Sequence, residues 1–375
     1  MATFSEAPGA SIRVGAGGPV FEGGPDFHAM IYSADGEITA PIALVGFANG
    51  SGGCLASDFA DFPDGAIALA PPGRCLRRDA VVNAGEAGAS AMVVTYPNRS
   101  TGNVLRPTLL FPDGIEIPAI SASGEVGDAL RAAADGGTHV TISVDTEIGS
   151  AMVHNVIAES RADSERVVML RGHLDSVHDG PGINDNGSGT AALLEVARVL
   201  AEQHPSSRVR FAFWAGEEFG SLGSRAYVES LSPAERAEIT AYLNLDMIGS
   251  PNYVPLVYDS PTAAPGSREI ADFLVTELEE AGIGAEQTDV GSGSDHAPFD
   301  AVEIPTGGIF SGATEIKSAA QAAAFGGTAD QPMDACYHLA CDTLVNVDID
   351  IVAVFATAAL AVTMALASGQ LPVGE

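Results

Sequence analysis

The chain has 375 residues, a length that fits two domains or one large one, and 46% of them are hydrophobic, so a sizeable core can form and global disorder does not fit. Its formal charge is −32, from 49 acidic and 17 basic residues. A surface of this charge would repel nucleic acid and anionic membranes, and we expect neither as a partner.

The surface composition fits two kinds of protein. Lys317 is the only lysine, and every other basic residue is arginine. An acidic, lysine-poor surface keeps a protein solvated at high salt, where self-repulsion is screened. A secreted enzyme from a high-GC genome would have the same composition.

Short strand patterns dominate residues 1–150. We expect strands at 41–47, 65–70, 91–96 and 139–144 and helices at 79–88 and 125–134, bounded by glycine and proline. This part predicts a small α+β module without a set of metal ligands.

From about residue 151, strands alternate with longer helices. The expected strands lie at 155–159, 166–172, 208–214, 241–246 and 305–310, and the helices at 190–203, 232–239, 268–281 and 348–367. This alternation predicts an α/β sheet covered on both faces. Ligands bind such sheets at the carboxyl ends of the strands.

Two segments bear on targeting. The opening Met-Ala-Thr-Phe-Ser-Glu has neither the basic nor the apolar region of a signal peptide. The one long uncharged apolar run, 351–367, has 17 residues and is marginal for crossing a bilayer. We expect it to form a packed C-terminal helix.

The four cysteines form two local pairs, Cys54 with Cys75 and Cys336 with Cys341. This arrangement suits two disulfides in an oxidising compartment, although four reduced thiols would fit as well. Neither pair has the spacing of a cysteine zinc site.

Six residues in four short motifs suggest a two-metal hydrolase. The motifs are R-G-H-L-D-S-V-H with G-I-N-D-N-G-S-G, W-A-G-E-E, L-N-L-D-M-I-G and C-Y-H-L-A-C, and the residues are His173, Asp185, Glu217, Glu218, Asp246 and His338. Two imidazoles and three carboxylates can hold two divalent ions if one carboxylate bridges. The remaining carboxylate, next to a ligand, is placed as a general base.

Taken singly, several of these residues fit plainer roles. His173 with Asp175 forms H-x-D, in which Asp175 could orient the imidazole, but a turn would produce the same pattern. Asp185 could form an ordinary Asx-turn before the helix at 190–203. Glu217 and Glu218 are harder to dismiss, because adjacent carboxylates at the end of an apolar strand repel each other unless cations compensate.

The donor types indicate the metal. Imidazole and carboxylate without thiolate fit zinc, and cobalt or manganese could substitute. Tyr337, beside His338, could hydrogen-bond a developing oxyanion or could simply pack. The chain has no G-x-S-x-G motif, so a serine nucleophile finds less support.

These motifs, together with S-D-H-A-P-F and K-S-A-A-Q-A, appear in an order that resembles the M28 metallopeptidases over about 151–370. The resemblance is strongest to the secreted aminopeptidases of the Streptomyces griseus type. Residues 20–146 resemble a protease-associated domain through Y-S-A-D-G-E-I-T-A-P, G-G-C-L-A-S-D-F and N-A-G-E-A-G-A-S-A. The implied organisation is an N-terminal segment at 1–19, the protease-associated domain at 20–146 and a catalytic domain at 147–375.

The resemblance implies a fold and residue roles. The expected fold is a mixed twisted sheet flanked by helices, of the zinc-peptidase, phosphorylase/hydrolase-like kind, plus a small α+β domain. His173 and Asp246 would hold one zinc ion, Glu218 and His338 the other, and Asp185 would bridge. Glu217 would be the general base, and Tyr337 would polarise the scissile carbonyl. Met247 and Phe310 are candidates for an apolar substrate pocket, with a core role equally open.

The sequence departs from the resembled type at two places. Gly293 stands where that type carries an arginine before S-D-H-A-P-F, and the chain begins almost at the protease-associated module.

We expect a secreted, monomeric di-zinc aminopeptidase that acts on peptides with a free N-terminus and prefers an apolar first residue. The alternatives are a carboxypeptidase or glutaminyl cyclase of the same fold, and a non-catalytic binding protein.

Overall fold

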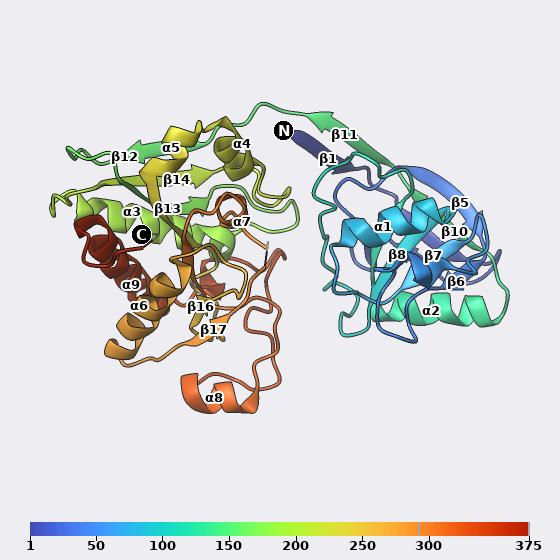
Figure 1. The fold of residues 1–375 in the computed structure, drawn as a ribbon. Coiled ribbons are helices and arrows are strands. Elements are labelled where there is room, and N and C mark those ends of the chain that lie inside the picture. Colours follow the sequence, from blue (N-terminus) through green and yellow to red (C-terminus); the bar gives the residue numbers. More distant parts are fainter. Residues whose placement is uncertain (292, 374–375) are drawn as a thin grey trace. The chain divides into compact units, whose positions relative to one another are not determined.

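A computed structural model describes residues 1–291 and 293–373. The chain divides into two compact units, Met1–Met152 and Val153–Glu375 (Figure 1). The domain bounds expected from the sequence stay a prediction.

The first unit contains two main sheets, two α-helices and one short 3-10 helix. Its five-stranded sheet has the order β4-β9-β8-β7-β6, in which β6 to β9 are parallel, and its four-stranded sheet has the antiparallel order β3-β2-β10-β5. Strand β1 pairs with β11. The strands are β1 (Ala2–Glu6), β2 (Ser11–Val14), β3 (Val20–Glu22), β4 (Phe27–Ala29), β5 (Gly36–Ala40), β6 (Ile42–Leu44), β7 (Ile67–Ala70), β8 (Ala91–Tyr96), β9 (Ala119–Ser123), β10 (Val140–Val144) and β11 (Thr146–Ser150), and the helices are η1 (Ala56–Phe59), α1 (Arg77–Glu86) and α2 (Gly124–Asp135).

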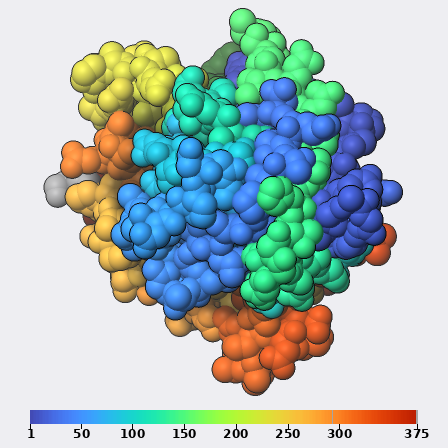
Figure 2. Space-filling model, turned by 90° about the vertical axis from the view of Figure 1, so that its right-hand side faces the viewer, coloured from blue at the N-terminus to red at the C-terminus, as the bar shows by residue number. Residues whose placement is uncertain are grey.

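Helix α2 closes the core of the first unit. Ser123 caps it by accepting a hydrogen bond from the Val126 N–H at 3.3 Å. Its buried residues Val126 and Leu130 pack with Ile67 and Val93 of the sheet. Figure 2 shows one face of this unit, on which the green residues of α2 lie beside blue residues of the N-terminal strands.

The second unit is built on a seven-stranded mixed sheet with the order β12-β14-β13-β15-β18-β16-β17. Strands β14, β13, β15 and β18 are parallel, whereas β12 and β16 run antiparallel to their neighbours β14 and β18. The strands are β12 (Val156–Glu159), β13 (Val167–His173), β14 (Arg208–Trp214), β15 (Ile239–Leu245), β16 (Leu256–Tyr258), β17 (Glu286–Thr288) and β18 (Thr306–Phe310). The helices are η2 (Ile183–Ser188), α3 (Gly189–Leu200), α4 (Leu222–Ser230), α5 (Pro233–Glu238), α6 (Ser267–Glu280), α7 (Ala297–Asp300), α8 (Ala319–Phe325), η3 (Leu344–Asn346) and α9 (Ile349–Ser368).

Both faces of the central strands of this sheet are buried. Along β13, Val168 and Leu170 join the core beneath α3, α6 and α9, while Val167 and Met169 join a second core with residues of α4 and α7. Figure 1 shows α3, α6 and α9 together along one side of the sheet. Strand residues whose side chains point to opposite faces of the sheet therefore contact different layers of helices, which confirms the predicted α/β fold.

Among the helices in the described part of the chain, only α9 is long and apolar enough to cross a membrane. Its residues Phe355, Val362 and Leu366 lie in the core with α3 and α6. The packing confirms the expected C-terminal helix. Both expected disulfides are also present, Cys54–Cys75 in the first unit and Cys336–Cys341 in the second.

Candidate metal centre

The carboxyl ends of three parallel strands bring the candidate residues together. His173 is the last residue of β13 and lies opposite Trp214, the last residue of β14. Glu217 and Glu218 follow β14, and Asp246 directly follows β15. Because parallel strands end at one edge of a sheet, these side chains converge although they are far apart in sequence.

One group of donors surrounds His173. Its Nε2 lies 3.2 Å from Asp185 Oδ1 and 3.2 Å from Asp246 Oδ1. The three ligand atoms all lie within 4.8 Å of one another, and the three residues are buried or, for the Asp246 side chain, nearly so. This spacing suits one metal ion between an imidazole and two carboxylates.

A second group surrounds His338. Its Nε2 lies 3.0 Å from Asp185 Oδ2 and 3.0 Å from Glu218 Oε2. Asp185 therefore belongs to both groups, and each of its oxygens faces a different imidazole. A carboxylate in this position can bridge two ions.

The electrostatics of this centre favour positive charge. The other Glu218 oxygen, Oε1, is buried and has no hydrogen-bond partner. Burial alone would lower the pKa of His338, but the Glu218 and Asp185 carboxylates together outweigh burial and raise that pKa to about 10. Similarly, burial would raise the pKa of Asp246, but His173 and Arg171 hold it below its ordinary value. Buried carboxylates of this density are costly unless positive charge compensates, which divalent ions would supply.

The loop that carries Asp185 is held by another carboxylate. Asp342 accepts hydrogen bonds from the backbone N–H of Asn184 at 2.8 Å and of Asp185 at 3.1 Å. Asn184 in turn donates to Asp334 at 2.7 Å. The sequence did not predict this support, although Asp342 directly follows the cysteine that closes the His338 loop.

His338 lies in the turn closed by the Cys336–Cys341 disulfide. Its backbone adopts a left-handed conformation, with φ of 59°. The ring of Tyr337 stacks on the imidazole, with ring centroids 3.8 Å apart. The short disulfide loop therefore fixes both side chains beside the donor groups.

Asp175 supports the centre through atoms other than those expected. The His173 Nδ1 lies 3.0 Å from the main-chain carbonyl oxygen of Asp175 but 3.7 Å from its carboxylate. The carboxylate instead accepts hydrogen bonds from the backbone N–H of Glu217 at 3.1 Å and of Glu218 at 3.2 Å. Asp175 thus orients the imidazole with its backbone and anchors the two glutamates with its side chain.

Behind Asp246 lies a buried network that the sequence did not predict. The Arg171 guanidinium is fully buried and lies 3.3 Å from Asp246 Oδ2 and 3.1 Å from Asp295 Oδ2. Ser294 also donates to Asp246 Oδ2, and Asn244 accepts from Arg171. The one sequence feature that could have indicated this network was an arginine within an otherwise apolar strand. Its contacts fix the Asp246 oxygen that faces away from His173.

A cavity of about 390 Å³ opens onto both donor groups. Glu217 lines it, and the Ser221 hydroxyl donates to Glu217 Oε1 at 3.4 Å. Burial raises the pKa of Glu217 well above its ordinary value, with His173 acting in the opposite direction. Tyr337 and Gly293 also line this catalytic cavity, as do Met247 and Phe310, the two residues proposed from the sequence for an apolar pocket.

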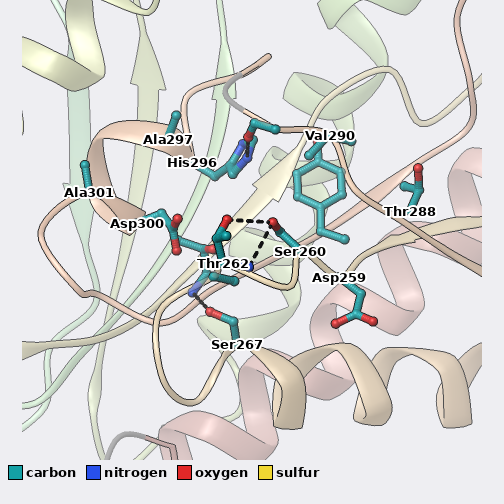
Figure 3. A pocket seen from close by; sticks show the side chains of 14 residues that line it. Asp259, Ser260, Thr262, Ser267, Thr288, Val290, His296, Ala297, Asp300 and Ala301 are labelled. Atoms are coloured by element: carbon teal, nitrogen blue, oxygen red, sulfur yellow. Dashed lines mark hydrogen bonds between the residues drawn. The ribbon is translucent and has the colours of Figure 1, made fainter.

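A second cavity, of about 330 Å³, shares Tyr258, Thr288 and Val290 with the first. Figure 3 shows the Ser260 and Thr262 hydroxyls facing each other, at 3.1 Å. Three more of its polar groups have partners: Ser267 accepts from the Thr306 N–H, Asp300 accepts from the Ala264 N–H, and Asp259 pairs with Arg268. The buried His296 Nδ1, by contrast, has no hydrogen-bond partner. Carboxylates of both donor groups line the first cavity, among them Glu218, whose buried Oε1 has no hydrogen-bond partner, which favours that cavity as the reaction site.

Comparison with known proteins decides the family. The model of peptidase family M28 matches residues 155–363, and that of the PA domain matches residues 38–130. An aminopeptidase of Pseudomonas aeruginosa is 37% identical over 96% of this chain and 70% of its own length. The chain belongs to peptidase family M28. This membership confirms the family, the inserted protease-associated domain and the metallopeptidase class expected from the sequence.

Two further relatives extend the comparison. Leucine aminopeptidase 2 of Arthroderma otae is 37% identical over 85% of this chain, which spans 65% of that relative's length. The solved aminopeptidase from Aneurinibacillus sp. strain AM-1 has a TM-score of 0.73 and 26% identity over all of this chain and 84% of its own. The aminopeptidase activity expected from the sequence agrees with these relatives.

Proposed function

We propose that this chain is an exported, monomeric zinc aminopeptidase with two ions in its catalytic centre. The observation that carries the proposal is the position of Asp185, whose two oxygens each face a different imidazole. His173 and Asp246 would hold one ion, His338 and Glu218 the other, and Asp185 both. Ions bound there would polarise a carbonyl oxygen and make water acidic enough to attack at neutral pH.

Glu217 is the proposed general base. It lines the cavity beside Glu218 but belongs to neither donor group. It takes a proton from the attacking water and returns that proton to the leaving amine, so one carboxylate serves both halves of the reaction. The hydrogen bonds from the Glu217 and Glu218 N–H groups to Asp175 fix the backbone positions of the proposed base and of the neighbouring ligand.

Tyr337 is proposed to stabilise the tetrahedral oxyanion. Its ring position is fixed by stacking on His338, and it lines the catalytic cavity. Its hydroxyl would donate a hydrogen bond to the carbonyl oxygen as negative charge develops there. Burial raises the pKa of Tyr337 well above its ordinary value, so the donor proton is retained.

The charge of the cavity explains why a free N-terminus is required. Glu217 and Asp246 both line the cavity and would attract the α-ammonium group of a peptide. Met247 and Phe310 would contact the side chain of that first residue, consistent with leucine aminopeptidases among the relatives. The two disulfides support an exported protein, because such bonds persist in oxidising compartments.

Hydrolysis of aminoacyl-p-nitroanilides, compared with the same substrates blocked at the amine, tests the reaction. We expect turnover of leucyl-p-nitroanilide and none of N-acetyl-leucyl-p-nitroanilide. Turnover of N-blocked peptides from the carboxyl end would point to a carboxypeptidase, and cyclisation of N-terminal glutamine to a glutaminyl cyclase. Zinc analysis should give about two ions per chain; no zinc and no turnover would leave only a binding function.

A further inference from the structure

The catalytic cavity contains two carboxylates that belong to neither donor group. Asp289 directly follows β17, and Glu315 lies in the loop after β18. Both side chains are exposed and line the cavity. The four other lining carboxylates are accounted for as proposed ligands or base, whereas these two have no role in the chemistry.

Each of the two carboxylates is oriented by its own loop. Asp289 Oδ1 accepts a hydrogen bond from the Gly291 N–H at 3.0 Å, and Glu315 Oε2 accepts one from the Ala313 N–H at 2.7 Å. The second oxygen of each group accepts no hydrogen bond from the residues that the structure describes. Among the residues that the structure describes, no arginine, lysine or histidine forms an ion pair with either carboxylate.

Part of the cavity lining is an apolar wall, alongside the polar Thr288, Ser294 and Thr314. Met247, Leu256 and Phe310 line the same cavity. Leu256 and Phe310 pair across β16 and β18, so their positions are fixed by the sheet. A side chain with an aliphatic stem and a cationic tip matches such a cavity, because the stem buries apolar area while the tip stays hydrated near negative charge.

No basic side chain lines the described part of this cavity. Gly293, where the resembled enzymes carry an arginine, contributes no side chain at all. An acidic substrate side chain would therefore meet like charge without compensation, which is an effective way to reject it. A basic one would meet two carboxylates that pair with no basic side chain in the described part of the chain.

The geometry points to selection of substrates by charge at the first residue. This inference rests on the proposed aminopeptidase function. Asp289 and Glu315 favour an N-terminal lysine or arginine over uncharged residues of the same shape, and they disfavour an N-terminal aspartate or glutamate. Leucine and methionine remain substrates through the apolar wall. The two carboxylates contact the substrate side chain rather than the reacting atoms, so the selectivity should lie mainly in KM.

Arginyl- and citrullyl-p-nitroanilide test this directly. The two side chains have nearly the same shape and differ in charge, and neither substrate has a second residue. Because exposed ion pairs are weak, we expect arginine to be preferred in kcat/KM by about two- to fivefold per carboxylate at low salt. Asp289→Asn with Glu315→Gln should bring the ratio close to one and improve glutamyl-p-nitroanilide. High salt should reduce the wild-type ratio by screening.

The matched control removes the same charge outside the cavity. Glu279→Gln with Glu280→Gln, on the exposed end of α6, should leave the arginine-to-citrulline ratio unchanged. A wild-type ratio at or below one, with leucine still hydrolysed, would overturn the charge selection alone. A ratio that persists in Asp289→Asn with Glu315→Gln would overturn the assignment to these residues. If no aminoacyl-p-nitroanilide is hydrolysed, the proposed function itself fails.

Discussion

Each unit of this protein contains parallel strands whose carboxyl ends meet at one edge of a sheet, but the residues at those ends differ. In the first unit, strands β6, β7, β8 and β9 are followed by Val45, Pro71, Pro97 and Gly124. In the second unit, the corresponding edge carries the imidazole and carboxylates of the donor groups. Among the described residues, candidate metal-binding groups therefore lie in the second unit only, despite the similar architecture.

The difference shows what the sheet contributes and what the side chains contribute. Parallel strands bring distant residues to one edge in both units. Only charged donors at that edge create a demand for cations, as the unpartnered Oε1 of Glu218 indicates. The fold supplies the convergence, and the side chains at the strand ends supply the chemistry.

The largest expected effect comes from removing the base at the end of β14. Glu217→Gln should lower turnover by about 10²–10⁴, because positioned acid–base catalysis is worth that much. Bound zinc should remain near the wild-type amount, since Glu217 lies outside both donor groups. Steady-state kinetics with metal analysis on the same preparation measures both quantities.

The matched substitution in the first unit is Glu125→Gln, which changes an exposed carboxylate shortly after the end of β9. We expect its turnover to equal that of the wild type. Near-normal turnover in Glu217→Gln would remove this residue from the mechanism and erase the functional contrast between the two strand edges.

Much of this contrast could be predicted from the sequence. Predicted strands ended at residues 172, 214 and 246, which is directly before His173, shortly before Glu217 and at Asp246, and β13, β14 and β15 end within one residue of those positions. The prediction succeeded because an apolar run of strand length fits a buried strand, and charged residues directly after it need compensating partners. The helices at 190–203 and 268–281 also correspond to α3 and α6 within a few residues.

The supporting residues could not be predicted, because their partners are distant in sequence. Arg171 acquires its role from Asp246 and Asp295, and Asp342 acquires its role from backbone N–H groups near Asp185. No local pattern specifies such contacts. Short strands such as β16 and β17, with three residues each, also lack enough residues for a periodic signal.

The second-largest effect concerns the disulfide of the first unit. Cys54→Ser with Cys75→Ser opens a loop of 21 residues and should lower the free energy of unfolding of this unit by about 3 kcal/mol. Turnover of the intact chain under native conditions should be unchanged. Hydrogen exchange of peptides from β8 and α2 would report the stability of this unit separately.

The corresponding change in the second unit, Cys336→Ser with Cys341→Ser, should act in the opposite way. Its loop is short, but His338 and Tyr337 lie inside it. We expect reduced turnover and weaker zinc binding with little change in the first unit. Equal effects of the two double variants on turnover would contradict the separation of structural and catalytic roles.

A smaller effect is expected from the support of the Asp185 loop. Asp342→Asn weakens the acceptor for two backbone N–H groups and should reduce zinc affinity by about 10- to 100-fold, as is usual for residues that orient ligands. Asp348→Asn, which alters the cap of α9, is the control and should leave zinc affinity unchanged. Competition with a chelator measures the zinc affinity independently of activity. Equal zinc affinities of Asp342→Asn and the wild type would show that the Asp185 loop does not need the hydrogen bonds to Asp342.

The smallest effect follows from the uneven charge of the two units. Residues 1–152 contain 17 acidic and 7 basic side chains, a net charge of −10, which leaves 32 acidic and 10 basic side chains, a net charge of −22, for the second unit. The second unit is also the more acidic per residue, so screening of self-repulsion should stabilise it more. We expect sodium chloride to raise the unfolding temperature of both units, with the larger rise in the second. Trp214 fluorescence reports the unfolding of the second unit, because this tryptophan is buried beneath α4 and α7. Glu279→Gln with Glu280→Gln should reduce the salt response of the second unit only, and an equal response of both units would show that net charge does not govern it.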